Sequence, residues 1–227
     1  MLKLSGESLS GESGCGGITP AGLEKVTAEL KEAVENGAQI AIVIGGGNFW
    51  RGATKDMDRV TADYIGMLAT VMNALALADA LSSNGLPAVA LSAFNVSKLA
   101  QLYTREKAVA YLNDGSVVVL CGGTGNPFFT TDTTAALRAL EIEADILLKA
   151  TQVDGVYDSD PKTNPSARRY DTLTFNEAID KNLKVMDLSA FSLCRENKLH
   201  LMVFDFHKNG NLARAVAGVK IGTIVSQ

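Results

Sequence analysis

Short runs of consecutive apolar residues alternate with helix-like patterns along the whole chain. Two of the runs are IAIVI at residues 40–44 and VVVL at residues 117–120. Because they are apolar on consecutive residues rather than on every second one, both faces of each strand should be buried. Such alternation is typical of an α/β fold with a mostly parallel sheet and helices on both faces. The expected strands are residues 1–4, 39–44, 86–91, 116–120, 146–148, 201–204 and 223–225.

Two helices are well marked in the sequence. The first should begin after Thr19 as the N-cap, carry Pro20 in its first turn and end before Gly37. The second is expected over residues 59–82 and is apolar around most of its girth. One face of a sheet cannot cover such a helix, so its second face is predicted to form a subunit contact. Residues 159–168, SDPKTNPSAR, read as an exposed loop.

Composition limits the possible partners. The chain has 227 residues and a formal net charge of −4, which leaves no general cationic field for nucleic acid. Its cysteines, Cys15, Cys121 and Cys194, have no CxxC spacing, so neither a disulfide framework nor a zinc site is expected. Neither a signal-peptide core nor an unbroken apolar run of about 18 residues occurs. We therefore expect a cytoplasmic protein without a membrane segment.

Three glycine-rich segments directly follow predicted strands: KLSGE at residues 3–7, GGGN at 45–48 and GGTGNPFFTTD at 122–132. Ligands of open α/β sheets gather beyond the carboxyl ends of the strands. Glycine lets the backbone approach a phosphate oxygen, and a following helix N-terminus adds positive charge. Each segment alone could equally be a tight turn. Together they predict a phosphate site, although neither a Walker A loop nor GxGxxG is present.

Two cations accompany these segments. Lys3 stands at the mouth of the first strand, where it could supply a mobile charge to the β and γ phosphates, and the alternative is a solvated terminal lysine. Arg51 follows GGGN and could bridge phosphates, and the alternative is a surface salt bridge.

The motifs KLSGE, VIGGGNFWRG, GMLATVMNALAL, GTGNPFFTTD, EADILLKAT, VDGVY and LKVMDL follow one another along the chain. Their residues and order resemble those of bacterial UMP kinases, in the amino acid kinase superfamily, over essentially the whole chain. The resemblance implies a three-layer αβα sandwich around a mainly parallel sheet. It also implies one domain, 1–227, with a UMP half, 1–145, and an ATP half, 146–227. Family members carry more residues before KLSG, so either the start codon is assigned late or the first strand is short, and the intact mass of the native protein would decide.

The resemblance further implies reversible phosphoryl transfer from ATP to UMP, giving UDP and ADP in pyrimidine nucleotide biosynthesis. Mg²⁺ should accompany ATP, without a metal site of the protein's own. A homohexamer, a trimer of dimers, is expected, together with activation by GTP and inhibition by UTP.

Site residues follow by matching positions with the family. The implied catalytic residues are Lys3, Arg51, Asp132 and Lys149. The implied UMP contacts are Gly46, Asp63, Thr124, Gly125, Asn126, Pro127, Phe128, Phe129, Thr130 and Thr131. The implied ATP contacts are Lys3, Leu4, Ser5, Gly6, Gly47, Arg51, Thr151, Gln152, Tyr157 and Asp160, and the side-chain role of Gln152 is left open. The loop implied in the GTP response is Gly11, Glu12, Ser13, Gly14, Cys15 and Gly16, which could equally be a plain turn.

The chemistry needs no general base, because a UMP phosphate oxygen is already a nucleophile at neutral pH. Asp132 is therefore expected to position the lysines. Asp63 could be a helix-capping residue, or a carboxylate that interacts with the helix dipole, instead of a ribose ligand. At least one ring of Phe128 and Phe129 is expected in the core, while the other supports uracil.

Two rival functions remain open on the sequence. One is a sibling kinase acting on an amino acid or carbamate, and the other is a non-catalytic nucleotide-binding or storage protein of the same fold. GTGNPFFTTD favours the uridylate branch.

Overall fold

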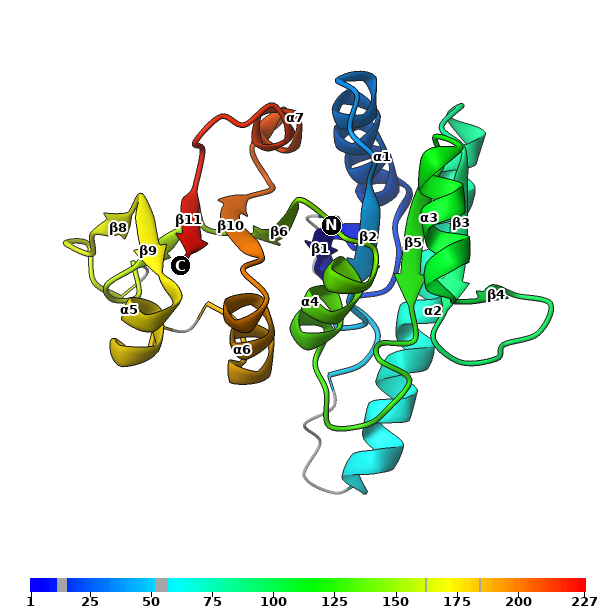
Figure 1. Cartoon of the computed structure of the whole chain (residues 1–227). Coiled ribbons are helices and arrows are strands. Elements are labelled where there is room, and N and C mark those ends of the chain that lie inside the picture. The colour runs from blue at the N-terminus through cyan, green and yellow to red at the C-terminus, as the bar shows by residue number, and fades with distance from the viewer. Residues whose placement is uncertain (12–15, 52–56, 162, 184) are drawn as a thin grey trace.

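A mainly parallel sheet organises the molecule. The computed structural model describes residues 1–11, 16–51, 57–161, 163–183 and 185–227. The sheet has nine strands in the order β4-β3-β5-β2-β1-β6-β10-β11-β9 (Figure 1). All neighbouring strands are parallel except β10 and β11. The strands are β1 (Leu2–Leu4), β2 (Ala41–Ile44), β3 (Ala88–Ser92), β4 (Gln101–Leu102), β5 (Val117–Cys121), β6 (Ile146–Thr151), β9 (Thr172–Thr174), β10 (His200–Asp205) and β11 (Thr223–Ser226). The predicted α/β class is confirmed.

The strand order divides the sheet into two halves along the sequence. Strands β1 to β5 lie on one side of the junction between β1 and β6, and β6, β9, β10 and β11 lie on the other (Figure 1). A separate antiparallel pair, β7 (Val156–Tyr157) with β8 (Arg169–Tyr170), projects from the second half. Because β1, β2, β5 and β6 are parallel, their carboxyl ends meet at one edge of the sheet.

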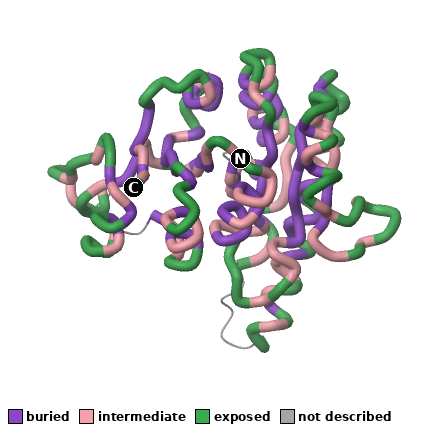
Figure 2. The backbone as a smooth tube through the Cα atoms, viewed as in Figure 1, coloured by how far each residue is buried: buried purple, intermediate pink, exposed green. Residues whose placement is uncertain are grey.

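Helices cover both faces, as the sequence predicted. One face carries α1 (Pro20–Glu35), α2 (Arg59–Ser83) and α7 (Asn211–Val216), and the other carries α3 (Arg105–Asn113), α4 (Thr131–Glu141), α5 (Phe175–Asp180) and α6 (Leu188–Glu196). Alternate residues of one strand enter different cores, since Ile42 and Ile44 pack on one side while Ala41 and Val43 pack on the other. This explains the consecutive apolar residues, and the central strands β2 and β5 are accordingly buried (Figure 2).

The helix starts follow the sequence signals. Thr19 caps α1, with its Oγ1 accepting a 3.1 Å hydrogen bond from Gly22 N. Asp58 caps α2, with its carboxylate accepting a 2.9 Å hydrogen bond from Thr61 N. The predicted loop at 159–168 consists of turns and irregular backbone in its described residues.

Helix α2 is buried on one side only. Leu77 and Leu81 are fully buried against the sheet, whereas Tyr64, Leu68 and Met72 on the outer side are about half exposed. By length and composition α2 also meets the requirements for a membrane span, as a core helix can, and it is the one helix among the described residues that does. The outer side is open in the single chain, and its cover by a second subunit stays a prediction.

Candidate active site

Lys3 and Lys149 lie side by side on the neighbouring parallel strands β1 and β6. Residues in register point to the same face of a sheet, and two adjacent ammonium groups repel each other. Asp132, in the first turn of α4, lies between them: its Oδ1 is 2.8 Å from Lys3 Nζ and its Oδ2 is 2.5 Å from Lys149 Nζ. The three side chains are only 13–15% exposed, so each depends on the others for compensation of its charge. The solvated-lysine alternative for Lys3 is therefore wrong.

The charged groups of this cluster shift the pKa values of Asp132 and Lys149. Burial would raise the pKa of Asp132, but the ammonium groups of Lys3 and Lys149 outweigh it and hold that pKa below its ordinary value. Burial lowers the pKa of Lys149, and Asp132 opposes this effect. Lys149 Nζ also donates a 2.5 Å hydrogen bond to Val185 O. A carboxylate with both oxygens on lysines is suited to hold two cations in place rather than to abstract a proton.

The start of α4 presents Asp132 to the lysines. Thr130 is the N-cap residue, and its Oγ1 accepts hydrogen bonds from Asp132 N at 3.1 Å and Thr133 N at 3.2 Å. The positive end of the helix dipole favours a carboxylate in this first turn, and it favours a phosphate nearby for the same reason.

Asp63 anchors the loop that carries the GTGNPFFTTD motif. Its Oδ2 accepts a 2.7 Å hydrogen bond from Phe128 N, and its carboxylate pairs with Arg59 Nε at 2.9 Å. Asp58, not Asp63, caps α2, so the capping alternative for Asp63 is wrong.

Both phenylalanine rings of the motif face outward. Phe128 has a left-handed φ of 72°, rare for a residue with a side chain, and the Arg59 guanidinium lies 5.8 Å from its ring centroid. Phe128 is 63% and Phe129 51% exposed. The expectation that one ring belongs to the core is wrong, because both rings are more than half exposed and neither belongs to a hydrophobic core.

Two further hydrogen bonds hold this segment, one to α2 and one within the segment. Gly122 N donates to Thr70 Oγ1 of α2 at 2.8 Å, and Asn126 N donates to Thr124 Oγ1 at 3.2 Å. The segment that leads from β5 into α4 thus includes Thr124, Gly125, Asn126, Pro127, Phe128, Phe129 and Thr130, and Thr131 is the first residue of α4.

A cleft of about 1000 Å³ opens at the carboxyl ends of β1, β2 and β6. Among the predicted ATP contacts, Ser5, Gly47, Arg51, Thr151 and Gln152 line it. Gly47 is open to the cleft, since an added Cβ would meet only Glu7 Oε1, at 3.8 Å. Of the described residues that line this cleft, none belongs to the 124–131 loop.

Other predicted ATP contacts lie outside the cleft lining. The Leu4 side chain is fully buried in the core, so only its backbone could face a nucleotide. Gly6 packs closely on Asn48 and Asn73. Asp160 has its carbonyl oxygen in a turn, where it accepts from Asn164 N at 2.8 Å.

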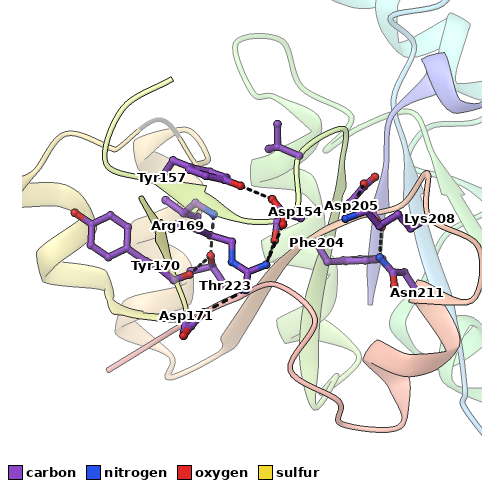
Figure 3. A network of polar contacts seen from close by, with 12 residues as sticks. Asp154, Tyr157, Arg169, Tyr170, Asp171, Phe204, Asp205, Lys208, Asn211 and Thr223 are labelled. Carbon is purple, nitrogen blue, oxygen red and sulfur yellow. Dashed lines mark hydrogen bonds and ion pairs between the residues drawn. The ribbon is translucent and has the colours of Figure 1, made fainter. Parts of the chain in front are cut away.

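Tyr157 belongs to a polar network in the second half of the chain (Figure 3). Its hydroxyl donates a 2.6 Å hydrogen bond to Asp154, whose other carboxylate oxygen lies 3.1 Å from Arg169 Nη1. Val156 N donates to Thr223 Oγ1 at 2.8 Å, which ties the segment to β11. The network therefore shapes the loop after β6.

Arg51 forms the ion pair that the sequence left as its alternative. It pairs with Glu7 of the short helix η1 (Gly6–Leu9), and its side chain is 77% exposed. Since both residues line the cleft, this pair lies at the rim of a candidate phosphate site.

The predicted GTP loop meets the same cleft. Gly11 and Gly16, its two described ends, are among the lining residues. Glu12, Ser13, Gly14 and Cys15 lie outside the described residues.

Gly46, predicted to face UMP, has a packing role. An added Cβ would lie 2.7 Å from Gly66 O and 2.9 Å from Ala69 Cβ, so the end of β2 approaches α2 closely. This close approach requires glycine whether or not its backbone meets a ligand.

Several polar residues at the site carry no signal in the sequence. Lys25 of α1 and His207 after β10 line the cleft but belong to no glycine-rich segment. Asp187 hydrogen bonds to Thr130 and Thr133, and only its place in the LKVMDL motif could have indicated it.

These features define an α/β protein in which a helix N-terminus and two buried lysines converge at one edge of the sheet. The chain belongs to the amino acid kinase family, which matches residues 1–205 under the description "Amino acid kinase family". This confirms the superfamily indicated by the motifs.

Solved structures are similar over nearly the whole chain. A UMP kinase from Bacillus anthracis has 38% identity and a TM-score of 0.95, covering 99% of this chain and 94% of that chain. A UMP kinase from Ureaplasma parvum has 39% identity and a TM-score of 0.92, covering 100% and 97%. A uridylate kinase from Archaeoglobus fulgidus has 32% identity and a TM-score of 0.72, covering 99% of each.

Proposed function

We propose that this chain is a UMP kinase, which reversibly transfers a phosphoryl group from ATP to UMP and yields ADP and UDP for pyrimidine nucleotide biosynthesis. One observation carries the proposal: the GTGNPFFTTD loop runs directly into Asp132, which lies between Lys3 and Lys149. The acceptor loop and the buried cations thus meet at one helix N-terminus. The similarity to proteins described as UMP kinases supports the same assignment.

UMP would bind in the half formed by residues 1–145, between Asp63 and the 124–131 loop. The exposed rings of Phe128 and Phe129 offer apolar faces for uracil, and the carboxylate of Asp63 can accept from ribose hydroxyls. ATP would bind in the cleft, with Gly47 and Arg51 on its phosphates and Thr151 and Gln152 from residues 146–227 on the nucleoside side.

The residues would act by placement and charge. Phosphoryl transfer spreads negative charge over the transferring oxygens, which Lys3 and Lys149 can neutralise while Asp132 keeps the two ammonium groups apart. A general base is unnecessary, because the attacking oxygen of UMP is already ionised.

Mg²⁺ would enter with ATP and neutralise charge on its phosphates. The donor chemistry fits this role: both Asp132 oxygens are engaged by lysines, and the described residues hold no cluster of three His, Cys, Asp or Glu. Mg²⁺ commonly keeps several waters and takes its remaining ligands from substrate phosphates.

Assembly, regulation and location extend the proposal. The exposed outer side of α2 would be a contact of a homohexamer, a trimer of dimers, and analytical ultracentrifugation showing a monomer at micromolar concentration would end this part of the proposal. GTP would activate and UTP would inhibit the enzyme, which would act in the cytoplasm. Gly11 and Gly16 line the cleft, so a bound nucleotide there would influence the GTP loop, residues 11–16.

The direct test is ADP release from ATP and Mg²⁺ with UMP, CMP, dUMP, acetylglutamate or carbamate as acceptor. We expect turnover with UMP far above that with the other acceptors. Preference for acetylglutamate or carbamate would support a sibling kinase, and no turnover with any acceptor would favour a binding protein.

A further inference from the structure

Asp187 joins two helix N-termini that flank the lysine cluster. It is the N-cap of α6, and its Oδ1 accepts a 3.0 Å hydrogen bond from Ala190 N. The same oxygen accepts a 2.8 Å hydrogen bond from Thr133 Oγ1, and Oδ2 accepts a hydrogen bond from Thr130 Oγ1. A residue that served only to cap its own helix would not need these contacts to α4.

The other hydrogen bonds of the Thr130 hydroxyl determine the direction of its bond with Asp187. Thr130 Oγ1 already accepts from Asp132 N and Thr133 N as the cap of α4. A hydroxyl has two lone pairs and one proton, so the proton is left for Asp187. Asp187 therefore orients the cap that holds the backbone of Asp132.

The segment directly before Asp187 also contacts Lys149, the second lysine of the cluster. Val185 O, two residues earlier, accepts a 2.5 Å hydrogen bond from Lys149 Nζ. One short segment thus holds Lys149 through a carbonyl and the start of α4 through a carboxylate. The geometry of Asp132 relative to Lys149 depends on this segment.

We propose that Asp187 is a positioning residue for phosphoryl transfer: through Thr130 and Thr133 it fixes the first turn of α4, and hence Asp132, against Lys149. The inference rests on the proposed kinase function. It gives a role to the LKVMDL motif. It also makes the end of the 124–131 loop depend on Asp187, which belongs to the other half of the chain.

Asp187→Asn separates this role from simple capping. Asparagine caps a helix about as well as aspartate. Its single oxygen can keep Ala190 N and Thr133, but its NH₂ group then faces Thr130, whose lone pairs are already occupied. The variant should keep the N-cap of α6. It should lose the contact that orients the Thr130 hydroxyl, which caps α4.

The first measurement is a double-mutant cycle in steady-state turnover with ATP and UMP, using Asp187→Asn, Thr130→Val and the double variant. We expect each single variant to lower kcat at least about tenfold, and the double variant to be no more than about threefold worse than the poorer single variant. Thr130→Ser, which retains the hydroxyl, should be less impaired in kcat than Thr130→Val. The proposal would be overturned if the two losses of kcat multiplied in the double variant. A kcat of Asp187→Asn within twofold of wild type would overturn it as well.

The second measurement does not depend on turnover. Amide hydrogen exchange of Asp132 and Thr133 should accelerate at least tenfold in Asp187→Asn, while Ala190 stays protected by the asparagine cap. Thr104→Ala, which removes the cap of α3, serves as the control and should leave α4 exchange unchanged. Unchanged exchange at α4 would overturn the positioning role, whereas lack of UMP turnover in wild type with accelerated exchange would overturn only the kinase function.

Discussion

Asp63 on α2 accepts a 2.7 Å hydrogen bond from the backbone N–H of Phe128, although the two residues are 65 positions apart. The bond ties the 124–131 loop to the first turns of α2 and places a carboxylate at the backbone of Phe128, whose ring is exposed. It also holds Phe128 in a left-handed conformation that residues with side chains rarely adopt. The carboxylate of Asp63 thus holds the 124–131 loop in place and is also the proposed ligand of the ribose.

Asp63→Ala should chiefly weaken UMP binding. A hydrogen bond to a charged group contributes about 1.5–3 kcal/mol, so we expect the Michaelis constant for UMP to rise about 10- to 100-fold. The control is Asp58→Ala, which removes the α2 cap and should cost about 1 kcal/mol of stability with little effect on that constant. An unaltered UMP Michaelis constant in Asp63→Ala would exclude Asp63 from acceptor binding.

Lys3→Ala should lower turnover far more than it raises the Michaelis constant for UMP. Its charge is most useful in the transition state, and loss of one such donor costs about 10²–10³ in kcat. Lys220→Ala, at an exposed position remote in sequence from the cluster, is the control for loss of a lysine. Unchanged turnover in Lys3→Ala would remove this residue from the mechanism.

Asp132→Asn should destabilise the protein in a pH-dependent way. The folded-state pKa of Asp132 is lowered, so its stabilising contribution is present above the unfolded pKa of about 3.9 and is lost as pH falls through the folded value. Removing one partner of a buried pair costs about 3–5 kcal/mol. Urea unfolding should therefore show the largest gap between variant and wild type near pH 7, with the gap shrinking below about pH 4. A gap that grows toward acid would contradict the assignment.

Sequence patterns predicted the strands and helix caps that depend on neighbouring residues in the sequence. The buried strands followed from runs such as residues 40–44, and the N-cap of α1 followed from residue type. Lys3 was indicated by its place beside a glycine-rich segment, whereas Asp132 and Lys149 were indicated only by the resemblance to the family. The two- and three-residue strands β4, β7, β8 and β9 were missed, because so few residues show no periodicity. Asp187 was missed because its partners, Thr130 and Thr133, are more than fifty residues away and meet it only in the folded chain.

Cys121 and Cys194 should be inert in the native protein. Burial raises the pKa of each thiol to about 12, so almost no thiolate exists at pH 8. In a Cys15→Ser background, a disulfide reagent at pH 8 should modify neither thiol within minutes, and both after addition of denaturant. Rapid modification of the native protein would mean that the cores around β5 and α6 open easily.

Gly46 and Gly47 are adjacent in sequence, but the same substitution should affect them differently. A Cβ at Gly46 would clash with Gly66 O at 2.7 Å, whereas at Gly47 it would meet only Glu7 Oε1, at 3.8 Å. Overpacking typically costs about 1–3 kcal/mol, so Gly46→Ala should lower the free energy of unfolding by that amount.

Gly47→Ala should fold with nearly wild-type stability and instead raise the Michaelis constant for ATP, because the methyl group would occupy space in the cleft where phosphates are proposed to bind. Chemical denaturation and ATP titration of both variants separate the two effects, with each glycine serving as the control for the other. Equal loss of stability would contradict the packing difference, and an unchanged ATP Michaelis constant in Gly47→Ala would mean that the nucleotide phosphates do not approach this backbone.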